Sequence, residues 1–218
     1  MNLAINRRMV LGGMAAAMLG QVAVSTWAQA SEGPDALIQR IAAEVIAAVK
    51  ADPAIQAGDI TKVVPLVDTK IMPYVNFTRM TASAVGRFWR QATPEQKQKL
   101  LVEFKTLLVR TYSGALGQVR DQTLALKPLR ANAADTEVVV RSELRGKGEP
   151  IQMDYRMEKT EAGWKIYDLN VLGVWLVDTY RGQFAQEINA KGLDGLIASL
   201  VQRNRNNAAE KPLAGSKG

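Results

Sequence analysis

The sequence predicts an α+β domain in which a curved, four-stranded antiparallel meander packs against a layer of helices. Apolar residues recur at helical spacing up to about residue 120, alternate with a period of two up to about residue 171, and then return to helical spacing. Only short, turn-forming segments separate the strand candidates, so consecutive strands are expected to pair antiparallel. This order of helices, strands and helices favours a sheet covered by helices around one core.

Residues 1–30 have the pattern of a secretory signal peptide. The motif "NRR" precedes an uncharged apolar run, and "AQA" at the end of the segment is a small-x-small cleavage site. The run is too short and too rich in Gly and Ala for a membrane span. We therefore expect a periplasmic protein that matures at Ser31, with the general and the twin-arginine export routes both open.

The composition excludes several kinds of chemistry. The chain of 218 residues contains neither His nor Cys, which removes Ser-His-Asp and Cys-His catalysis, the commonest zinc sites and disulfide bonds. Its acidic residues are scattered, and the sequence has no phosphate-binding glycine loop and no nucleophile elbow. We therefore expect neither an enzyme nor a site for a metal ion or cofactor.

The charge of the chain indicates which partners to expect. The net charge is +7, and loss of the two leader arginines lowers it to +5. The surplus is dispersed among acidic residues, and an exported protein is not expected to bind nucleic acid. Anionic lipid headgroups and an acidic protein partner remain open.

Helices are expected before the strands. The first covers residues 34–50 and carries one apolar stripe along its length. The second is bracketed by Pro65 and Pro73, with Pro65 at its first position. The third has Asn76 as its N-cap and runs to about Arg90.

A capping box formed by Thr93 and Gln96 predicts the start of a long helix. Its apolar residues recur at spacings of three and four, as one buried helix face requires. They are Leu100, Leu101, Phe104, Leu107, Leu108, Tyr112 and Ala115.

Four segments with two-residue alternation are the strand candidates: "TLALKPL" (123–129), "TEVVVRSEL" (136–144), "PIQMDYRMEK" (150–159) and "WKIYDLNV" (164–171). Two helices are expected after them, one from about Val174 to Ala190 and one after Gly192. Residues 31–205 are expected to form a single domain. Residues 206–218 contain little to bury and are predicted to be a disordered tail.

The segment "IQMDYRM" alternates without a slip, and its apolar side is the most informative strand face. Ile151, Met153, Tyr155 and Met157 lie on one side of an extended chain. Two interpretations are open for this face. It is either ordinary core or the wall of a cavity, for which the flexible Met side chains are well suited.

Two long blocks of the sequence resemble a known family. They are "PYVNFTRMTASAVGRFWRQATPEQKQKLLVEFKTLLVRTYSGAL" (73–116) and "WKIYDLNVLGVWLVDTYRGQFAQEINAKGLDGL" (164–196). Their ordered motifs are similar to those of MlaC-like proteins, also called the toluene-tolerance family. The main departure is Trp175, where many relatives have a small residue.

The resemblance implies a fold similar to that of nuclear transport factor 2-like domains, with a cone of helices over a curved sheet that encloses a hydrophobic cavity. It also implies a phospholipid carrier. Such a carrier would shuttle a diacyl phospholipid, as cargo, between a lipoprotein complex at the outer membrane and an ABC transporter complex at the inner membrane. It would thereby maintain the lipid asymmetry of the outer membrane, and a monomer is expected.

On this basis the candidate lipid-binding residues are Val75, Phe77, Met80, Leu108, Tyr112, Ile151, Met153, Tyr155, Met157, Val171, Val174, Leu176, Val177, Tyr180 and Phe184. For each of them, ordinary core packing is the alternative. Arg181 either pairs with a phosphate or is a solvated surface residue. The alternative function is that of an enzyme with the same fold that uses Asp168 and Tyr155 as an acid–base pair.

Overall fold

The computed structural model describes residues 32–116, 122–132, 134–146 and 148–209. The predicted signal peptide and residues 210–218 of the predicted tail lie outside these residues. The elements follow the chain in the order α1 (Pro34–Ala51), α2 (Pro53–Gln56), α3 (Ile60–Lys70), η1 (Met72–Tyr74), α4 (Phe77–Val85), η2 (Gly86–Arg90), α5 (Pro94–Leu116), β1 (Thr123–Leu126), β2 (Glu137–Arg145), β3 (Ile151–Thr160), β4 (Gly163–Val171), β5 (Val174–Trp175) and α6 (Leu176–Ala209).

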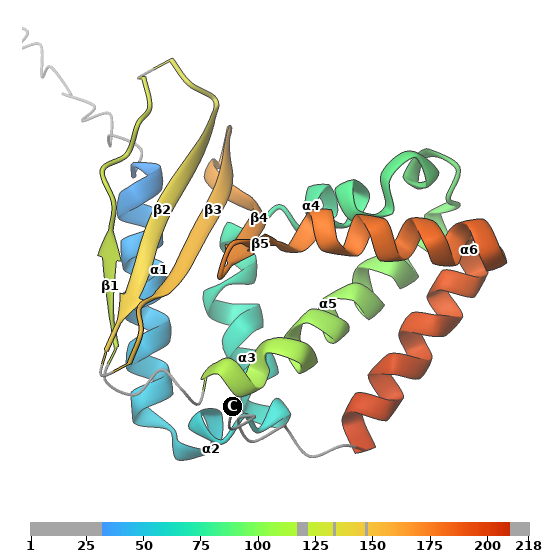
Figure 1. Cartoon of the computed structure of the whole chain (residues 1–218), viewed down its shortest axis with the longest axis horizontal. Helices are drawn as coiled ribbons and strands as arrows, with labels where there is room; N and C mark the ends of the chain where they lie inside the picture. The colour runs from blue at the N-terminus through green and yellow to red at the C-terminus, as the bar shows by residue number, and fades with distance from the viewer. Residues whose placement is uncertain (1–31, 117–121, 133, 147, 210–218) are drawn as a thin grey trace, which may run out of the picture. The chain divides into compact units, whose positions relative to one another are not determined.

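The strands form one sheet in the order β1-β2-β3-β4-β5, so neighbours in the chain are also neighbours in the sheet (Figure 1). All of these pairings are antiparallel. The predicted α+β meander is therefore confirmed, with one strand more than expected. The additional strand β5 consists of Val174 and Trp175, which pair with Val171 and Asn170 of β4.

Helix α1 covers one face of the sheet, here called the inner face. Its apolar stripe packs against buried side chains of β2, β3 and β4, which include Val140, Tyr155 and Met157. The opposite, outer face carries the polar residues that alternate with them, such as Asp154 and Arg156. The apolar stripe that the sequence predicts for this helix therefore packs against the sheet.

A bulge in β4 changes which residues reach the inner face. The register of β3 and β4 shifts between Arg156 and Met157, because Tyr167 is an extra residue on β4. As a consequence, Ile166 and Leu169 both lie on the inner face. Strict alternation would have placed them on opposite faces.

Behind the bulge, the Asp168 carboxylate ties β4 to the start of α6. It is 1% exposed, and its Oδ1 accepts hydrogen bonds from the backbone amides of Val177 (3.0 Å) and Leu169 (2.9 Å). A carboxylate satisfies a free amide and complements the dipole at a helix N-terminus. The predicted helix start at about Val174 is two residues too early, because Val174 and Trp175 form β5. The helix begins at Leu176, within reach of Asp168.

The predicted helix caps are confirmed at two places. Thr93 and Gln96 form the reciprocal capping box, with distances of 3.0 and 3.2 Å. The Asn76 side chain accepts a hydrogen bond from the Arg79 amide at 3.0 Å. The helix after Asn76 becomes a 3-10 helix at Gly86, where φ is 65°, a value that disrupts regular α-helix.

The expected start of the second helix is wrong. Helix α3 begins after Asp59, whose side chain accepts a hydrogen bond from the Thr61 amide at 2.9 Å. Pro65 therefore lies inside the helix rather than at the first position, so it cannot donate a backbone hydrogen bond there and its ring crowds the preceding turn. The short helix α2 was not expected. It starts at an Asp52 cap of the same kind.

The last predicted boundaries lie within α6. The expected break at Gly192 is confirmed, because its φ of 72° and ψ of −178° separate two helical segments (Figure 1). Residues 206–209, predicted to be tail, are helical. The Gln202 side chain donates to Asn206 one turn further at 2.8 Å, and extending an existing helix requires no new nucleus.

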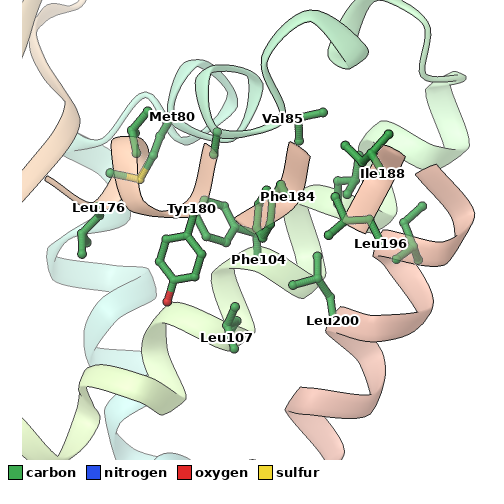
Figure 2. Packing of buried hydrophobic residues seen from close by; sticks show 14 residues of the cluster. Met80, Val85, Phe104, Leu107, Leu176, Tyr180, Phe184, Ile188, Leu196 and Leu200 are labelled. Carbon is green, nitrogen blue, oxygen red and sulfur yellow. The ribbon is translucent and has the colours of Figure 1, made fainter. Parts of the chain in front are cut away.

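A second core lies between α4, α5 and α6. Figure 2 shows its aromatic centre, where Phe104 of α5 contacts Tyr180 and Phe184 of α6 edge-on. The ring centroids lie 4.9 and 5.2 Å from Phe104. Edge-on aromatic pairs of this kind stabilise by about 1 kcal/mol beyond the burial of their area. A third, smaller cluster joins α1, α2 and α3.

We predict that Asp168→Ala lowers the free energy of unfolding by about 2–4 kcal/mol, because two backbone amides lose their acceptor and Arg156 loses its buried partner. Asp168→Asn retains an acceptor and should cost less. Asp178→Ala is the control, because Asp178 contacts the same arginine but is 47% exposed. Its cost should stay below about 1 kcal/mol. Guanidinium unfolding measures all three, and equal losses for Asp168→Ala and Asp178→Ala would contradict the prediction.

Candidate functional site

An apolar cavity of about 360 Å³ lies between the inner face of the sheet and the helices. Its walls come from α1, α3, α4, α5 and the strands β1 to β4, together with the first residue of α6. Among the described residues that line it, Lys105 is the only one with a charged side chain. The polar side chains are those of Tyr112, Ser113 and Tyr155. A space of this size and chemistry accommodates an apolar ligand.

The structure brings most of the predicted site residues together around this cavity. Those that line it are Val75, Phe77, Met80, Leu108, Tyr112, Ile151, Met153, Tyr155, Val171 and Leu176. They come from the residue after η1 and from α4, α5, β3, β4 and α6, so the cavity unites segments that are far apart in the sequence.

The other predicted residues lie elsewhere. Met157 is fully buried in the core beneath α1. Val177, Tyr180 and Phe184 belong to the core between α4, α5 and α6. Figure 2 shows Tyr180 and Phe184 beside Phe104. Val174 belongs to β5 and is 53% exposed.

The inner face of β3 is therefore partly cavity wall and partly ordinary core, so each of the two interpretations applies to part of it. Ile151, Met153 and Tyr155 border the cavity, while Met157 on the same face is covered by the stripe of α1. The strand passes from cavity to core within a single apolar face. Alternation alone carries no information about where that transition occurs.

Sequence reasoning missed the contribution of α1 and α3. The cavity residues from these helices are Ile38, Ile41, Ala42, Val45, Ile46, Val63, Leu66 and Val67. The apolar stripes of these helices are visible in the sequence. However, a stripe that faces a cavity has the same periodicity as one that packs against side chains. The bulge at Tyr167 likewise brings Ile166 and Leu169 together on the wall.

The cavity wall has little capacity for proton transfer. The Tyr155 hydroxyl donates a long hydrogen bond to the Met153 sulfur, at 4.0 Å, and it also interacts with the Ser142 side chain. Burial raises the pKa of Tyr155 to about 12. Tyr155 pairs with Leu169, the neighbour of Asp168, so the two side chains of the suggested acid–base pair lie on opposite faces of the sheet.

Asp168 is also engaged in the cap of α6 and in an ion pair with Arg156 at 2.9 Å. Burial raises its pKa, whereas the two amide donors and the arginine lower it. The acid–base pair of Asp168 and Tyr155 is therefore not present. Within the described ranges there is also no cluster of three or more acidic residues that could hold a metal ion.

No helix in the part of the chain that the structure describes is long and apolar enough to cross a membrane. The fold and the cavity define a class of α+β domains that enclose an apolar ligand between a sheet and its helices. The model of the MlaC protein family matches residues 39–202. The chain therefore belongs to the MlaC family.

Individual relatives agree with this assignment. The chain is 23% identical to the intermembrane phospholipid transport system binding protein MlaC of Haemophilus influenzae, over 82% of this chain and 86% of that protein. It is 28% identical to the toluene tolerance protein ttg2D of Pseudomonas putida, over half of each chain. A phospholipid-binding protein of Ralstonia solanacearum, solved in complex with a phospholipid, is 50% identical and superposes with a TM-score of 0.78 over 80% of this chain and 98% of that one.

The buried tyrosines predict alkaline destabilisation. Burial raises the pKa of both Tyr155 and Tyr180 to about 12, against 10.0 for a free phenol. Between these values the unfolded chain releases protons that the folded protein retains. The free energy of unfolding should therefore fall by about 1.4 kcal/mol per pH unit for each tyrosine as the pH rises from 10 to 12.

Tyr155→Phe removes one of these contributions, so its stability should fall less steeply than that of the wild type over the same pH range. Guanidinium unfolding at successive pH values, with tyrosinate absorbance recorded in parallel, measures both quantities. Identical slopes for the variant and the wild type would mean that the Tyr155 phenol is not buried.

Proposed function

We propose that this protein is a phospholipid carrier that encloses acyl chains in the cavity between sheet and helices. The observation that supports this most directly is the wall itself, whose described residues are apolar apart from Lys105 and three hydroxyl-bearing side chains. Such a wall offers no chemistry for a reaction but excludes water from an apolar ligand. A carrier function is also consistent with the positions of Asp168 and Tyr155 on opposite faces of the sheet, where they cannot act as an acid–base pair.

The energetics of lipid transfer explain why a carrier needs this cavity. An exposed methylene costs about 0.8 kcal/mol in water, so two chains of roughly sixteen carbons would cost on the order of 20 kcal/mol or more. Since an apolar cavity of about 150 Å³ holds one benzene molecule, about 360 Å³ corresponds to roughly fourteen carbons. This is about one acyl chain, and the flexible side chains of Met80 and Met153 allow the wall to adapt to more.

The relatives support the identity of the cargo. The Ralstonia protein, which is similar over almost its whole length, binds a phospholipid. The Haemophilus relative is named as a binding protein of an intermembrane phospholipid transport system. We infer a periplasmic carrier, matured from residue 31 and acting as a monomer, that exchanges lipid with an ABC transporter complex and an outer-membrane lipoprotein complex and so maintains outer-membrane lipid asymmetry.

We predict that the protein purified without detergent retains diacyl phospholipid, because the chains cannot leave the cavity without exposure to water. Native mass spectrometry should show the bound mass, and organic extraction should release the same lipid. If extracts contain no phospholipid at a meaningful stoichiometry, the carrier function is wrong.

A charge in the cavity wall should expel the cargo. Met153→Asp and Tyr155→Asp place an unpaired carboxylate where the acyl chains lie, and burying such a group costs several kcal/mol. Bound lipid should fall by about tenfold or more. It is measured by phosphate analysis of extracts from the purified variants.

Val139→Asp is the matched control for these variants. Val139 lies on the neighbouring strand β2 but pairs with Arg156, so its side chain is on the outer face, where a carboxylate meets a positive charge. Lipid content should stay at the wild-type level. A comparable loss in Val139→Asp would mean that the loss of lipid does not depend on the face of the sheet, which would contradict the assignment of the acyl chains to the cavity.

A further inference from the structure

Among the described residues that line the cavity, one carries a charge, and its position is informative. Lys105 lies on α5 and lines the apolar cavity. Its ammonium group forms an ion pair with Asp68 of α3 at 2.9 Å. Asp68 does not line the apolar cavity, so the charge of Lys105 is directed out of the apolar space and toward the junction of α3 and α5.

A second, smaller cavity of about 200 Å³ lies at this junction, here called the α3–α5 cleft. It is lined by Ile60, Val64, Asp68, Lys105, Thr106, Val109 and Arg110. Lys105 and Val109 line both cavities, so the cleft and the apolar cavity share a wall. The charged cleft therefore adjoins the apolar cavity at Lys105 and Val109.

Arg110 gives the cleft a donor without an acceptor. Its Nε is buried, and it has no hydrogen-bond partner in the described structure. Buried guanidinium donors are normally paired, because an unpaired one loses its hydration without compensation. With Lys105, Arg110 and Asp68, the cleft lining carries one net positive charge. That charge matches a group with a single negative charge and several acceptor oxygens.

We propose that the α3–α5 cleft binds a phosphodiester, and that this is the headgroup phosphate of the lipid whose chains occupy the apolar cavity. The proposal rests on the carrier function proposed above. Lys105 donates from its ammonium group in competition with Asp68, and Arg110 donates from its guanidinium group. Charge-assisted hydrogen bonds of this kind are about twice as strong as neutral ones, and arginine suits the geometry of phosphate.

The test compares two ligands that differ only in the phosphodiester. The protein is incubated with phosphatidylcholine vesicles that contain pyrene-labelled phosphatidylglycerol or pyrene-labelled diacylglycerol with the same acyl chains. The label bound by the reisolated protein is then counted. The wild type should take up phosphatidylglycerol in preference to diacylglycerol.

The double variant Lys105→Met, Arg110→Met keeps the apolar stems and removes both charges. Its uptake of phosphatidylglycerol should fall by about tenfold or more, whereas its uptake of diacylglycerol should not change. Unchanged diacylglycerol uptake also shows that the variant is folded. Lys105→Arg retains the charge and should preserve most of the preference.

Lys99→Met is the matched control, because Lys99 lies on the same helix, is exposed and lines neither cavity. Its uptake of both lipids should equal that of the wild type. If Lys99→Met lowers phosphatidylglycerol uptake as much as the double variant does, the effect is one of net charge and the assignment to the cleft is overturned.

Free phosphate is the other source of the same chemistry. Inorganic phosphate at millimolar concentration should not raise the Tm of the wild type if the cleft serves the lipid headgroup. A rise in the wild type that is absent in the double variant, together with equal lipid uptake by both proteins, would assign the cleft to free phosphate and overturn the headgroup proposal.

Failure of this proposal can be distinguished from failure of the carrier function. If wild type and double variant take up both lipids equally, the headgroup site is wrong and the carrier function stands. If the wild type takes up neither lipid, the carrier function itself is wrong.

Discussion

The carboxylate of Asp168 is the interaction on which the arrangement of the other elements depends. It accepts hydrogen bonds from the first turn of α6 and from its own strand, and it pairs with Arg156 of β3. The start and direction of α6 relative to the sheet follow from this contact. Because α6 packs against α4 and α5 through an aromatic core, the position of both helices is determined as well.

The bulge that directs the buried Asp168 side chain to the outer face of the sheet also shapes the cavity. The extra residue Tyr167 allows the acid to reach the outer face while Ile166 and Leu169 reach the inner one. In a regular strand the side chains alternate strictly, so Ile166 and Leu169 could not both lie on the inner face. The single irregularity therefore supplies both the polar anchor outside and the continuous apolar wall inside.

Other polar interactions of the sheet also lie outside the cavity and leave its wall apolar. Arg79 of α4 forms ion pairs with Glu137 and Glu158 and lies over the ring of Tyr167, 3.6 Å from its centroid. Asn76, the cap of the same helix, donates to Glu158 at 2.7 Å. These contacts fasten α4 to the sheet through partly exposed polar groups, so the interior needs no polar contact to hold its wall in place. The cavity can then stay apolar without loss of a defined structure.

The sequence by itself determined most of the elements, because local chemistry specifies them. The capping box at Thr93, the cap at Asn76 and the break at Gly192 depend on hydrogen bonds and backbone angles within a few residues. The alternation of β3 also determined which residues share a face. What it left open was whether that face meets side chains or empty space, since both require the same apolar pattern.

Only the tertiary structure decided the rest. The cap by Asp168, the two-residue strand β5 and the bulge at Tyr167 arise from contacts between separate elements, which no local pattern records. The same holds for the cavity wall. Met157 and Phe184 follow the same apolar rules as Met153, yet α1 covers the first and the aromatic core contains the second. A cavity is the volume that packed elements leave unfilled, so its lining is a property of their arrangement in space rather than of any one segment.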